Sequence, residues 1–470
     1  MEHPLGSAAR PLRVAVVGSG PSGFYAAAAL FKAELEVTVD MFDRLPTPFG
    51  LVRGGVAPDH QKIKNVIRVY DKTARDPRFR FFGNVSVGRD VAVAELAARY
   101  DAVIYAVGNE ADRPLGIPGE DLDGVYSATE FVGWYNGHPD FQDRSFALER
   151  AKRVAVVGNG NVAMDVTRIL AQDSDELHPT DITDEAVAAL RTSAVEEIVL
   201  LGRRGPAQAA FSPKEIKEIG DLRCADLIVD PEMMELDELT RTWMEGEPPS
   251  TKKNVEYLTE VCNQPPSGAR RRVLCRFLVS PVELLGEDGR LRAVRIEHNE
   301  LQPGADGAPR PRGTGRTELL EVDLLFKAVG YRGTPLDGVP FDERGGIFPN
   351  VEGRIVDPAS GQPIPGQYVV GWAKRGPTGL IGTNTADSQA TVASLLADVA
   401  GRSAPEAPAK DPAATPALLR ERGVDFVSYA DWQRLDQDEV TRGAATGKVR
   451  LKYTDVEEMM DAVRSLRTGG

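Results

Sequence analysis

The segment Arg13-Val-Ala-Val-Val-Gly18-Ser-Gly20-Pro-Ser-Gly23 decides the fold of this chain. The apolar run up to Val17 predicts a buried parallel strand, and an alanine-rich helix follows the glycines as far as about Leu30. A second strand, from Glu36 to Phe42, then ends at Asp43. Strand, glycine turn, helix, strand and acid in this order form the βαβ unit that binds dinucleotides.

Each glycine of this first turn has its own task. Gly18 permits the tight turn, Gly20 lets the backbone approach a pyrophosphate, and Gly23 allows the helix to lie close to the strand. The start of the helix offers free N–H groups and the positive end of its dipole to the anion. Asp43, about 25 residues after the first glycine, is placed to accept hydrogen bonds from ribose hydroxyls.

The same order of elements returns at Arg153-Val-Ala-Val-Val-Gly158-Asn-Gly160-Asn-Val-Ala163. A helix follows this second turn, and a strand from Glu197 to Leu201 comes next. That strand ends in Gly202-Arg203-Arg204, where a site for NAD would have an acid. Two guanidinium groups can pair with a 2′-phosphate, so the sequence favours NADPH over NADH at the second unit.

One unit that ends in an acid and one that ends in arginines indicate two nucleotides, FAD and NADPH, stacked against each other. A nicotinamide ring over the flavin can deliver a hydride without any protein nucleophile, because the cofactors carry the chemistry. A third glycine-rich stretch, from Gly371 to Asn384, leads into a helix expected from Asp387 and suits the negative charge of a reduced flavin. Trp372 in this stretch packs either on a cofactor ring or in the core.

We predict an α/β protein with two dinucleotide-binding, Rossmann-like domains. Two strands, which reach Gly108 and Gly330, both end in Ala-Val-Gly and mark the places where the chain passes between the domains. After an exposed linker rich in alanine and proline, Ser403–Thr415, we expect a helical appendage. The expected domains are an FAD-binding domain, residues 1–112 and 329–470 with the appendage, and an NADP-binding domain inserted in it, residues 113–328.

The composition limits the partners and the chemistry. A net charge of −14 argues against binding to nucleic acid or to an anionic membrane surface, since either would call for a basic patch. The chain has only three cysteines, without Cys-x-x-Cys spacing, which predicts no redox dithiol, no metal site and no iron–sulfur cluster of its own. Neither a signal peptide nor a membrane span is expected, so the predicted location is cytoplasmic.

Several longer motifs give the chain a resemblance to a known family over nearly its whole length. They are Gly18-Ser-Gly-Pro-Ser-Gly23, Leu45-Pro-Thr-Pro-Phe-Gly-Leu-Val-Arg53, Val56-Ala-Pro-Asp-His60, Gly158-Asn-Gly-Asn-Val-Ala-Met-Asp165, the stretch from Gly202-Arg-Arg-Gly-Pro206 to Phe211, and the segment Trp372–Asn384. With these motifs the chain closely resembles the adrenodoxin reductase-like ferredoxin–NADP⁺ reductases, particularly those of actinobacteria.

The resemblance implies which residues surround each cofactor. Those expected at the FAD, besides the glycines Gly18, Gly20 and Gly23, are Ser22, Asp43, Leu51, Val87, Trp372, Gly379, Leu380 and Ile381. Those expected at NADPH are Asn159, Gly160, Asn161, Val162, Arg203, Arg204 and Glu215, with Gly379 touching both cofactors. The family usually has Glu where this chain has Asp43, a shorter acid that reaches the ribose through a small backbone shift or a water.

His60 and Asp165 match family positions that lie near the flavin and belong to a hydrogen-bonded chain. Either residue could move the proton that leaves when a reduced flavin gives up electrons. A purely structural role is the open alternative, because hydride transfer itself needs no acid or base from a side chain.

The resemblance implies a ferredoxin–NADP⁺ reductase of the adrenodoxin reductase type, which passes electrons from NADPH through FAD to an iron–sulfur protein. The expected partner is a ferredoxin that can supply a downstream oxygenase or P450, and flavodoxin is compatible as well. An FAD- and NADPH-dependent monooxygenase and a non-catalytic NADPH-sensing flavoprotein are the alternatives. Because the chain and most ferredoxins are acidic, docking requires a local basic patch, either Lys252 with Lys253 or Arg270, Arg271 and Arg272.

Overall fold

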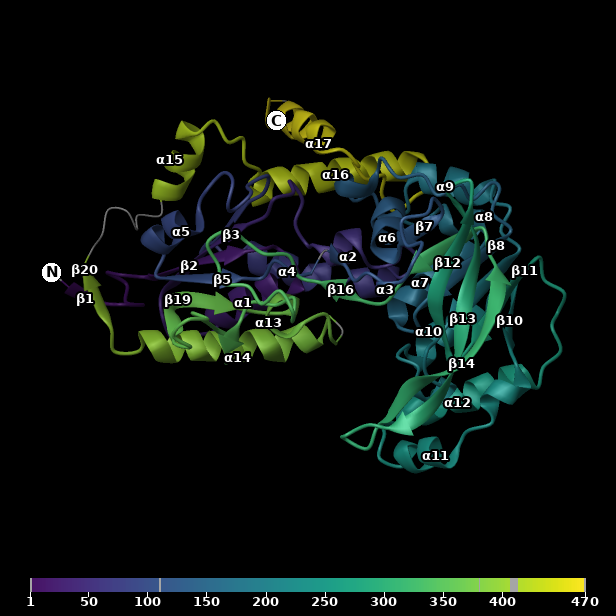
Figure 1. Ribbon diagram of the computed structural model, residues 1–470. Helices are drawn as coiled ribbons and strands as arrows, with labels where there is room; N and C mark the ends of the chain where they lie inside the picture. Colours follow the sequence, from purple (N-terminus) through teal and green to yellow (C-terminus); the bar gives the residue numbers. More distant parts are fainter. Residues whose placement is uncertain (1, 110, 380, 406–412, 469–470) are drawn as a thin grey trace. The chain divides into compact units, whose positions relative to one another are not determined.

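The computed structural model describes residues 2–109, 111–379, 381–405 and 413–468, without the side chains of Glu2 and Pro405. The chain divides into two compact units, whose elements are labelled in Figure 1. Unit 2 interrupts unit 1 in the sequence. Unit 1 consists of Met1–Val56, His60–Ala111 and Gly330–Gly470, and unit 2 of Ala57–Asp59 and Asp112–Val329.

Unit 1 is built on a mainly parallel sheet. Its seven strands lie in the order β17 (Asn350–Val351), β18 (Arg354–Val356), β19 (Pro363–Val369), β5 (Ala102–Tyr105), β2 (Leu12–Val17), β3 (Val37–Phe42) and β4 (Phe79–Phe82). Neighbouring strands from β19 to β4 are parallel, whereas β17, β18 and β19 pair antiparallel. Because parallel strands end at the same edge of a sheet, the glycine turn after β2 lies beside the residues that follow β3 and β5.

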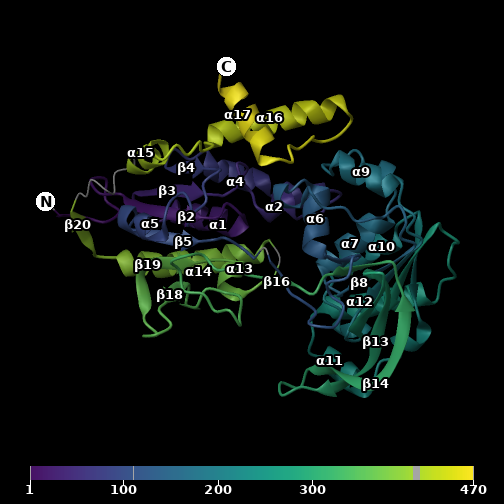
Figure 2. The same cartoon turned by 45° about the horizontal axis from the view of Figure 1, so that its top comes forward.

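Helices cover both faces of this sheet, since alternate residues of β2 pack in different core clusters. Val14 and Val16 pack with residues of α1 (Pro21–Leu30), α14 (Thr383–Val399) and α16 (Tyr429–Ala445). Ala15 and Val17 pack with residues of α5 (Val93–Arg99) and α15 (Ala414–Glu421). Helix α14 lies beside α1 (Figures 1 and 2). The other helices of unit 1 are α2 (Leu51–Gly54), α3 (Gln61–Lys64), α4 (Ile67–Ala74), α13 (Trp372–Arg375) and α17 (Val456–Thr468).

The exposed linker expected over Ser403–Thr415 is in part wrong. Ser403–Pro405 forms strand β20, which pairs antiparallel with β1 (Glu2–Pro4). Thr415 is buried in α15, where its hydroxyl shares a hydrogen bond with the hydroxyl of Tyr100. Residues 406–412 of the expected linker lie outside the described part of the chain. Helices α15, α16 and α17 follow, as the helical pattern predicts.

Unit 2 contains a parallel sheet of six strands. They lie in the order β10 (Ala225–Val229), β11 (Arg271–Arg276), β9 (Glu197–Leu201), β8 (Arg153–Val157), β15 (Leu324–Lys327) and β7 (Val125–Ser127). A second, antiparallel sheet of this unit consists of β12 (Val279–Glu287), β13 (Arg290–Pro303) and β14 (Pro309–Glu321). Figure 2 shows α11 (Glu238–Met244) near β13 and β14.

The helices of unit 2 begin mostly at residues that can cap them, such as Ser127, which accepts a hydrogen bond from Thr129 N at 2.9 Å. They are α6 (Ala128–Asn136), α7 (Asn161–Ala171), α8 (Ser174–Leu177), α9 (Asp184–Arg191), α10 (Pro213–Gly220) and α12 (Pro249–Cys262), besides α11. Strands β6 (Ala111–Asp112) and β16 (Tyr331–Arg332) form a separate sheet of two strands. Within the described residues, none of the helices of either unit combines the length and the apolar character needed to cross a membrane.

The two parallel sheets, each with a glycine turn directly after a central strand, confirm the predicted class of an α/β protein with two Rossmann-like units.

The first glycine of each turn lies against a carbonyl group at the end of the neighbouring strand. A Cβ atom built on Gly18 would lie 2.4 Å from the oxygen of Ala106, and one built on Gly158 would lie 2.3 Å from the oxygen of Ala328. Both glycines have positive φ, 104° and 131°. Ala106 and Ala328 are the alanines of the two Ala-Val-Gly endings, so this close approach gives those motifs a structural reason.

We predict that Gly158→Ala destabilises the folded protein, because the added Cβ meets a backbone carbonyl and φ lies in the left-handed region. The expected loss is about 2–4 kcal/mol of the free energy of unfolding, measured by urea unfolding followed by circular dichroism. Gly160→Ala is the matched control, since Gly160 has φ −98° and nothing lies within 4 Å of a Cβ built there. Equal stability of the two variants would contradict the steric explanation.

Candidate functional site

The first glycine turn leaves room for an anion at the start of α1. Gly20 is the N-cap residue of this helix, and no side chain caps the N–H groups there among the described residues. A Cβ atom built on Gly20 meets nothing within 4 Å, so the space above the turn is open. The exposed N–H groups and the helix dipole together favour a phosphate at this position.

Asp43 is held directly beside this turn. One of its carboxylate oxygens accepts hydrogen bonds from Ser19 N at 3.0 Å and Ser19 Oγ at 2.5 Å, and the other accepts one from Leu45 N at 3.0 Å. A carboxylate offers about four acceptor positions, so a further one is open to a ribose hydroxyl. The shorter acid that replaces the usual Glu is therefore oriented by its own turn.

The third glycine-rich stretch lies against the start of α1. A Cβ atom built on Gly371 would lie 2.1 Å from Ser22 Oγ, and Ser388 Oγ donates a hydrogen bond to Ser22 O at 3.0 Å. Asp387 accepts a hydrogen bond from Gly371 N at 2.6 Å, which fixes the entry to α13. The structure thus brings Ser22 together with the segment that begins at Trp372.

The residues of that segment differ in how they are placed. The ring of Trp372 packs against the ring of Tyr331, with 5.4 Å between the centroids. Gly379 is exposed with φ 81°, and Ile381 is half-buried against the core. Leu380 lies outside the described residues. Helix α14 begins at Thr383, four residues before the expected start.

Leu51 lies beside the first glycine turn, because the residues before it contact that turn. Phe49 N donates a hydrogen bond to Ser19 O at 3.0 Å, and a Cβ atom built on Gly50 would lie 3.0 Å from the Cα of Gly20. Val87 is half-buried at the core cluster that contains Val17 and Ala373. Most of the described residues expected at the FAD therefore lie at or next to the first glycine turn, namely Gly18, Gly20, Ser22, Gly23, Asp43 and Leu51. Trp372 directly follows Gly371, which packs on Ser22. No such contact places Val87, Gly379 or Ile381 at this turn within the described residues.

The second glycine turn is held by the segment that precedes α10. Asn159 O accepts a hydrogen bond from Ala210 N at 2.9 Å, and Asn161 Oδ1 accepts one from Ser212 N at 2.9 Å. Gly160 is the N-cap residue of α7 and is as open as its counterpart in the first turn. The side-chain nitrogen of Asn159 is buried without a hydrogen-bond partner in the described chain, which suits a contact to a bound molecule.

Arg203 and Arg204 follow β9 beside this turn. Their carbonyl oxygens accept hydrogen bonds from Asn299 Nδ2 at 2.9 Å and Leu278 N at 3.1 Å, so the backbone of the pair is fixed. Neither guanidinium has an acidic partner within the described residues. Burial, and then the charges of Arg203 and Arg310, lower the pKa of Arg204. A bound anion would relieve this repulsion between like charges.

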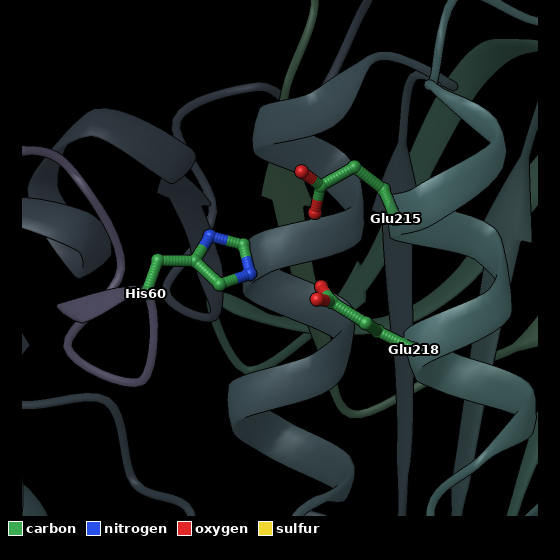
Figure 3. Close-up of side chains that lie close together, drawn as sticks. All are labelled: His60, Glu215 and Glu218. Atoms are coloured by element: carbon green, nitrogen blue, oxygen red, sulfur yellow. The ribbon is translucent and has the colours of Figure 1, made fainter. Parts of the chain in front are cut away.

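Asp165 and Glu215 share one buried cation, Arg168, whose side chain is 3% exposed. The guanidinium donates hydrogen bonds to Asp59 at 2.7 and 3.0 Å, to Asp165 at 2.6 Å and to Glu215 at 3.3 Å. Burial alone would lower the pKa of Arg168, but Asp59 and Asp165 raise it above its usual value. Glu218, one turn after Glu215, projects from the same side of α10 (Figure 3).

Arg168 was not among the residues expected at the site. The only local signal for it is the spacing Asp165-x-x-Arg168, which places the two side chains on one side of a helix. His60 is buried at the N-cap position of α3, where its carbonyl accepts a hydrogen bond from Ile63 N at 2.9 Å. Proton transfer by His60 or Asp165 stays a prediction.

The basic patch expected at Arg270, Arg271 and Arg272 is wrong for Arg271, whereas Arg270 and Arg272 are exposed. Arg271 is the first residue of β11 and is buried, where it donates hydrogen bonds to backbone carbonyl groups such as that of Val195. Arg272 pairs with Glu197 at 2.8 Å. Side chains of a strand alternate between its faces, so Arg271 points away from Arg272 and cannot share its exposed surface. Lys252 and Lys253, the other candidate pair, are exposed on α12.

Comparisons with known proteins agree with this geometry. Residues 12–199 match the family model for pyridine nucleotide-disulphide oxidoreductases. The NADPH-ferredoxin reductase FprA of Mycobacterium leprae is 46% identical over 453 residues, which cover 95% of this chain and 97% of that protein. The mitochondrial NADPH:adrenodoxin oxidoreductase of Homo sapiens is 43% identical over 470 residues, which cover 97% of this chain and 93% of that protein.

The structure is also similar to a solved one over nearly its whole length. Mycobacterium tuberculosis FprA in complex with NADPH gives a TM-score of 0.91 at 43% identity, and the match covers 97% of this chain and 100% of that chain. The chain therefore belongs to the adrenodoxin reductase-like family of NADPH–ferredoxin reductases.

Proposed function

We propose that the protein is an FAD-dependent NADPH–ferredoxin reductase. Relatives at 43–46% identity over nearly the whole chain have this activity in their names, and both glycine turns that the activity needs are present. When bound, FAD would supply an acceptor for the hydride of NADPH and a donor of single electrons to an iron–sulfur protein. The chain's own task is to bind the two nucleotides in the correct places.

For the FAD, the open turn at Gly18, Gly20 and Gly23 would hold the pyrophosphate. Asp43 would accept a hydrogen bond from the ribose at its remaining position. The other side chains and glycines that we propose around this cofactor are Ser22, Leu51, Val87, Trp372, Gly379, Leu380 and Ile381.

For NADPH, the second turn would hold the pyrophosphate through Asn159, Gly160, Asn161 and Val162. The observation that carries the choice of nucleotide is the pair Arg203 and Arg204, two adjacent guanidiniums without acidic partners in the described chain. We propose that they bind the 2′-phosphate. Glu215 and Gly379 complete the proposed site. Arg168 of the same unit donates a hydrogen bond to Glu215, which fixes the orientation of the Glu215 carboxylate.

The partner is an iron–sulfur protein of the ferredoxin type. Flavodoxin as a second acceptor and an oxygenase or P450 downstream stay predictions. A cytoplasmic location is also a prediction, and the human relative is mitochondrial by its name. A monooxygenase would differ by forming a lasting oxygen adduct after reduction, and a non-catalytic flavoprotein would not reduce an artificial acceptor with NADPH.

We predict that the purified protein carries about one FAD per chain and that Gly20→Val abolishes flavin binding, because the side chain fills the space above the turn. The flavin absorption spectrum after denaturation measures the content. Gly160→Val, the equivalent change in the second turn, should keep the flavin. A wild-type protein that takes up no flavin on reconstitution would refute the proposed function.

We predict that Arg203→Gln with Arg204→Gln raises the Michaelis constant for NADPH about tenfold or more, since charge-assisted contacts to a phosphate contribute about 1.5 to 3 kcal/mol each. The constant for NADH should change little. Arg270→Gln, an exposed arginine of the same unit that donates only to the Ser193 carbonyl in the described contacts, is the control. Equal losses with NADPH and NADH would assign the pair to the fold instead.

We predict that Lys252→Gln with Lys253→Gln slows the reduction of an acidic ferredoxin at low ionic strength and flattens its salt dependence. Reduction of ferricyanide by NADPH should stay unchanged. Lys214→Gln serves as the control, because Lys214 is also exposed on a helix of unit 2 but pairs with Glu218 at 3.0 Å. An unaltered salt profile would exclude the Lys252–Lys253 pair as the docking patch.

A further inference from the structure

The segment Phe49–Arg53 closes one side of the first glycine turn. Phe49 N donates to Ser19 O, and Gly50 approaches Gly20 so closely that a built Cβ would lie 3.0 Å from its Cα. Phe49 and Gly50 both have positive φ, 85° and 49°. Such a conformation costs free energy in a non-glycine residue, so surrounding contacts must hold Phe49 in place.

The rings of Phe24 and Tyr70 pack on Phe49, and further contacts to the segment come from α16 and the residues that follow it. Glu439 is fully buried, and its carboxylate accepts hydrogen bonds from both terminal nitrogens of Arg53, at 2.5 and 2.8 Å. Arg450 at 3.2 Å and Tyr453 N at 3.0 Å donate to the same carboxylate. Burial would raise the pKa of Glu439, but Arg53 and Arg450 lower it overall, which keeps the carboxylate ionised.

Two more side chains of the same region contact this segment. Trp432 lies two helical turns before Glu439, and its ring meets Phe49 edge to face at 5.8 Å and the Arg53 guanidinium at 5.1 Å. Lys452 donates a hydrogen bond to Arg53 O at 3.2 Å. Both the side chain and the carbonyl of Arg53 are thus held by residues almost four hundred positions later in the sequence, all of them in unit 1.

We propose that Glu439 is a positioning residue for the first nucleotide site: through Arg53 it holds the Phe49–Arg53 segment against the Ser19–Gly20 turn and so sets the affinity for FAD. The inference rests on the proposed function, because it takes the nucleotide of this turn to be FAD. It makes the C-terminal helices part of the cofactor site.

A buried ion pair elsewhere in unit 1 provides a control, because breaking it affects the stability of the protein without affecting the first glycine turn. Arg10 and Asp101 are 1% and 5% exposed and pair at 2.8 Å, and Asp101 also accepts a hydrogen bond from Arg13 N. These residues lie at the beginning of strands β2 and β5, the sheet edge opposite the glycine turn. Asp101→Asn is therefore a matched control, with an equally buried carboxylate that does not contact the turn.

The test measures the dissociation constant of FAD for the full-length protein after removal and titration of the flavin, followed by quenching of flavin fluorescence. Glu439→Gln should raise this constant about tenfold or more, since Arg53 loses its charged acceptor. Asp101→Asn should lower the melting temperature of the flavin-free protein at least as much, and its FAD dissociation constant should stay within about twofold of the wild type.

Lys452→Met is the second variant, because it removes a donor to the Arg53 carbonyl and leaves the ion pair between Arg53 and Glu439 in place. This variant should also raise the FAD dissociation constant, by a smaller factor than Glu439→Gln. It keeps the test decisive if Glu439→Gln does not fold. An unchanged dissociation constant in whichever of these variants folds would overturn the proposal while the proposed function stands. A wild-type protein without affinity for FAD would overturn both.

Discussion

Each of the two units depends on the same kind of contact. In both, the Cα atom of a glycine lies against the carbonyl group at the end of the neighbouring strand of the sheet. In unit 1, Gly18 N donates to Phe42 O and Ala106 N donates to Val17 O, at 2.8 and 2.7 Å. In unit 2, Gly158 N donates to Leu201 O at 2.9 Å and Ala328 N to Val157 O at 2.8 Å. The central strand is therefore bonded on both sides up to the turn, and only a residue without Cβ fits there.

We propose that the residues after the second strand of each βαβ motif select the nucleotide that the turn accepts. In unit 1 this residue is Asp43, whose carboxylate is fixed by Ser19 and Leu45 and accepts hydrogen bonds. In unit 2 the strand is followed by Arg203 and Arg204, whose charges repel each other until an anion arrives. On this proposal, two similar glycine turns followed by opposite charges would let one chain hold two different nucleotides.

Local patterns predicted the parts of the fold that are formed by neighbours in sequence. The strands Arg153–Val157 and Glu197–Leu201 begin and end at the expected residues, since apolar runs and glycine turns are local signals. The patch at Arg270, Arg271 and Arg272 is wrong for Arg271, because β11 begins at this residue and turns its side chain inward. The clusters of Arg168 and Glu439 could not be predicted in full, because the partners Asp59 and Arg53 lie 109 and 386 residues away in the sequence.

The two motifs that lie between the first turn and α3 contain charges that pair within the protein. Arg53 and Asp59, six residues apart in the sequence, are the anchors of two buried ionic clusters. Arg53 forms an ion pair with the buried carboxylate of Glu439 in unit 1. Asp59 forms an ion pair with the buried guanidinium of Arg168 in unit 2. Such clusters add little net stability, because desolvation offsets most of the attraction, but they tolerate only one geometry.

Arg168 lies on α7, which begins at the second glycine turn, and Arg53 lies on α2, which follows the residues that touch the first. Each unit thus has a buried ionic cluster near its glycine turn, in addition to the residues that form the turn itself.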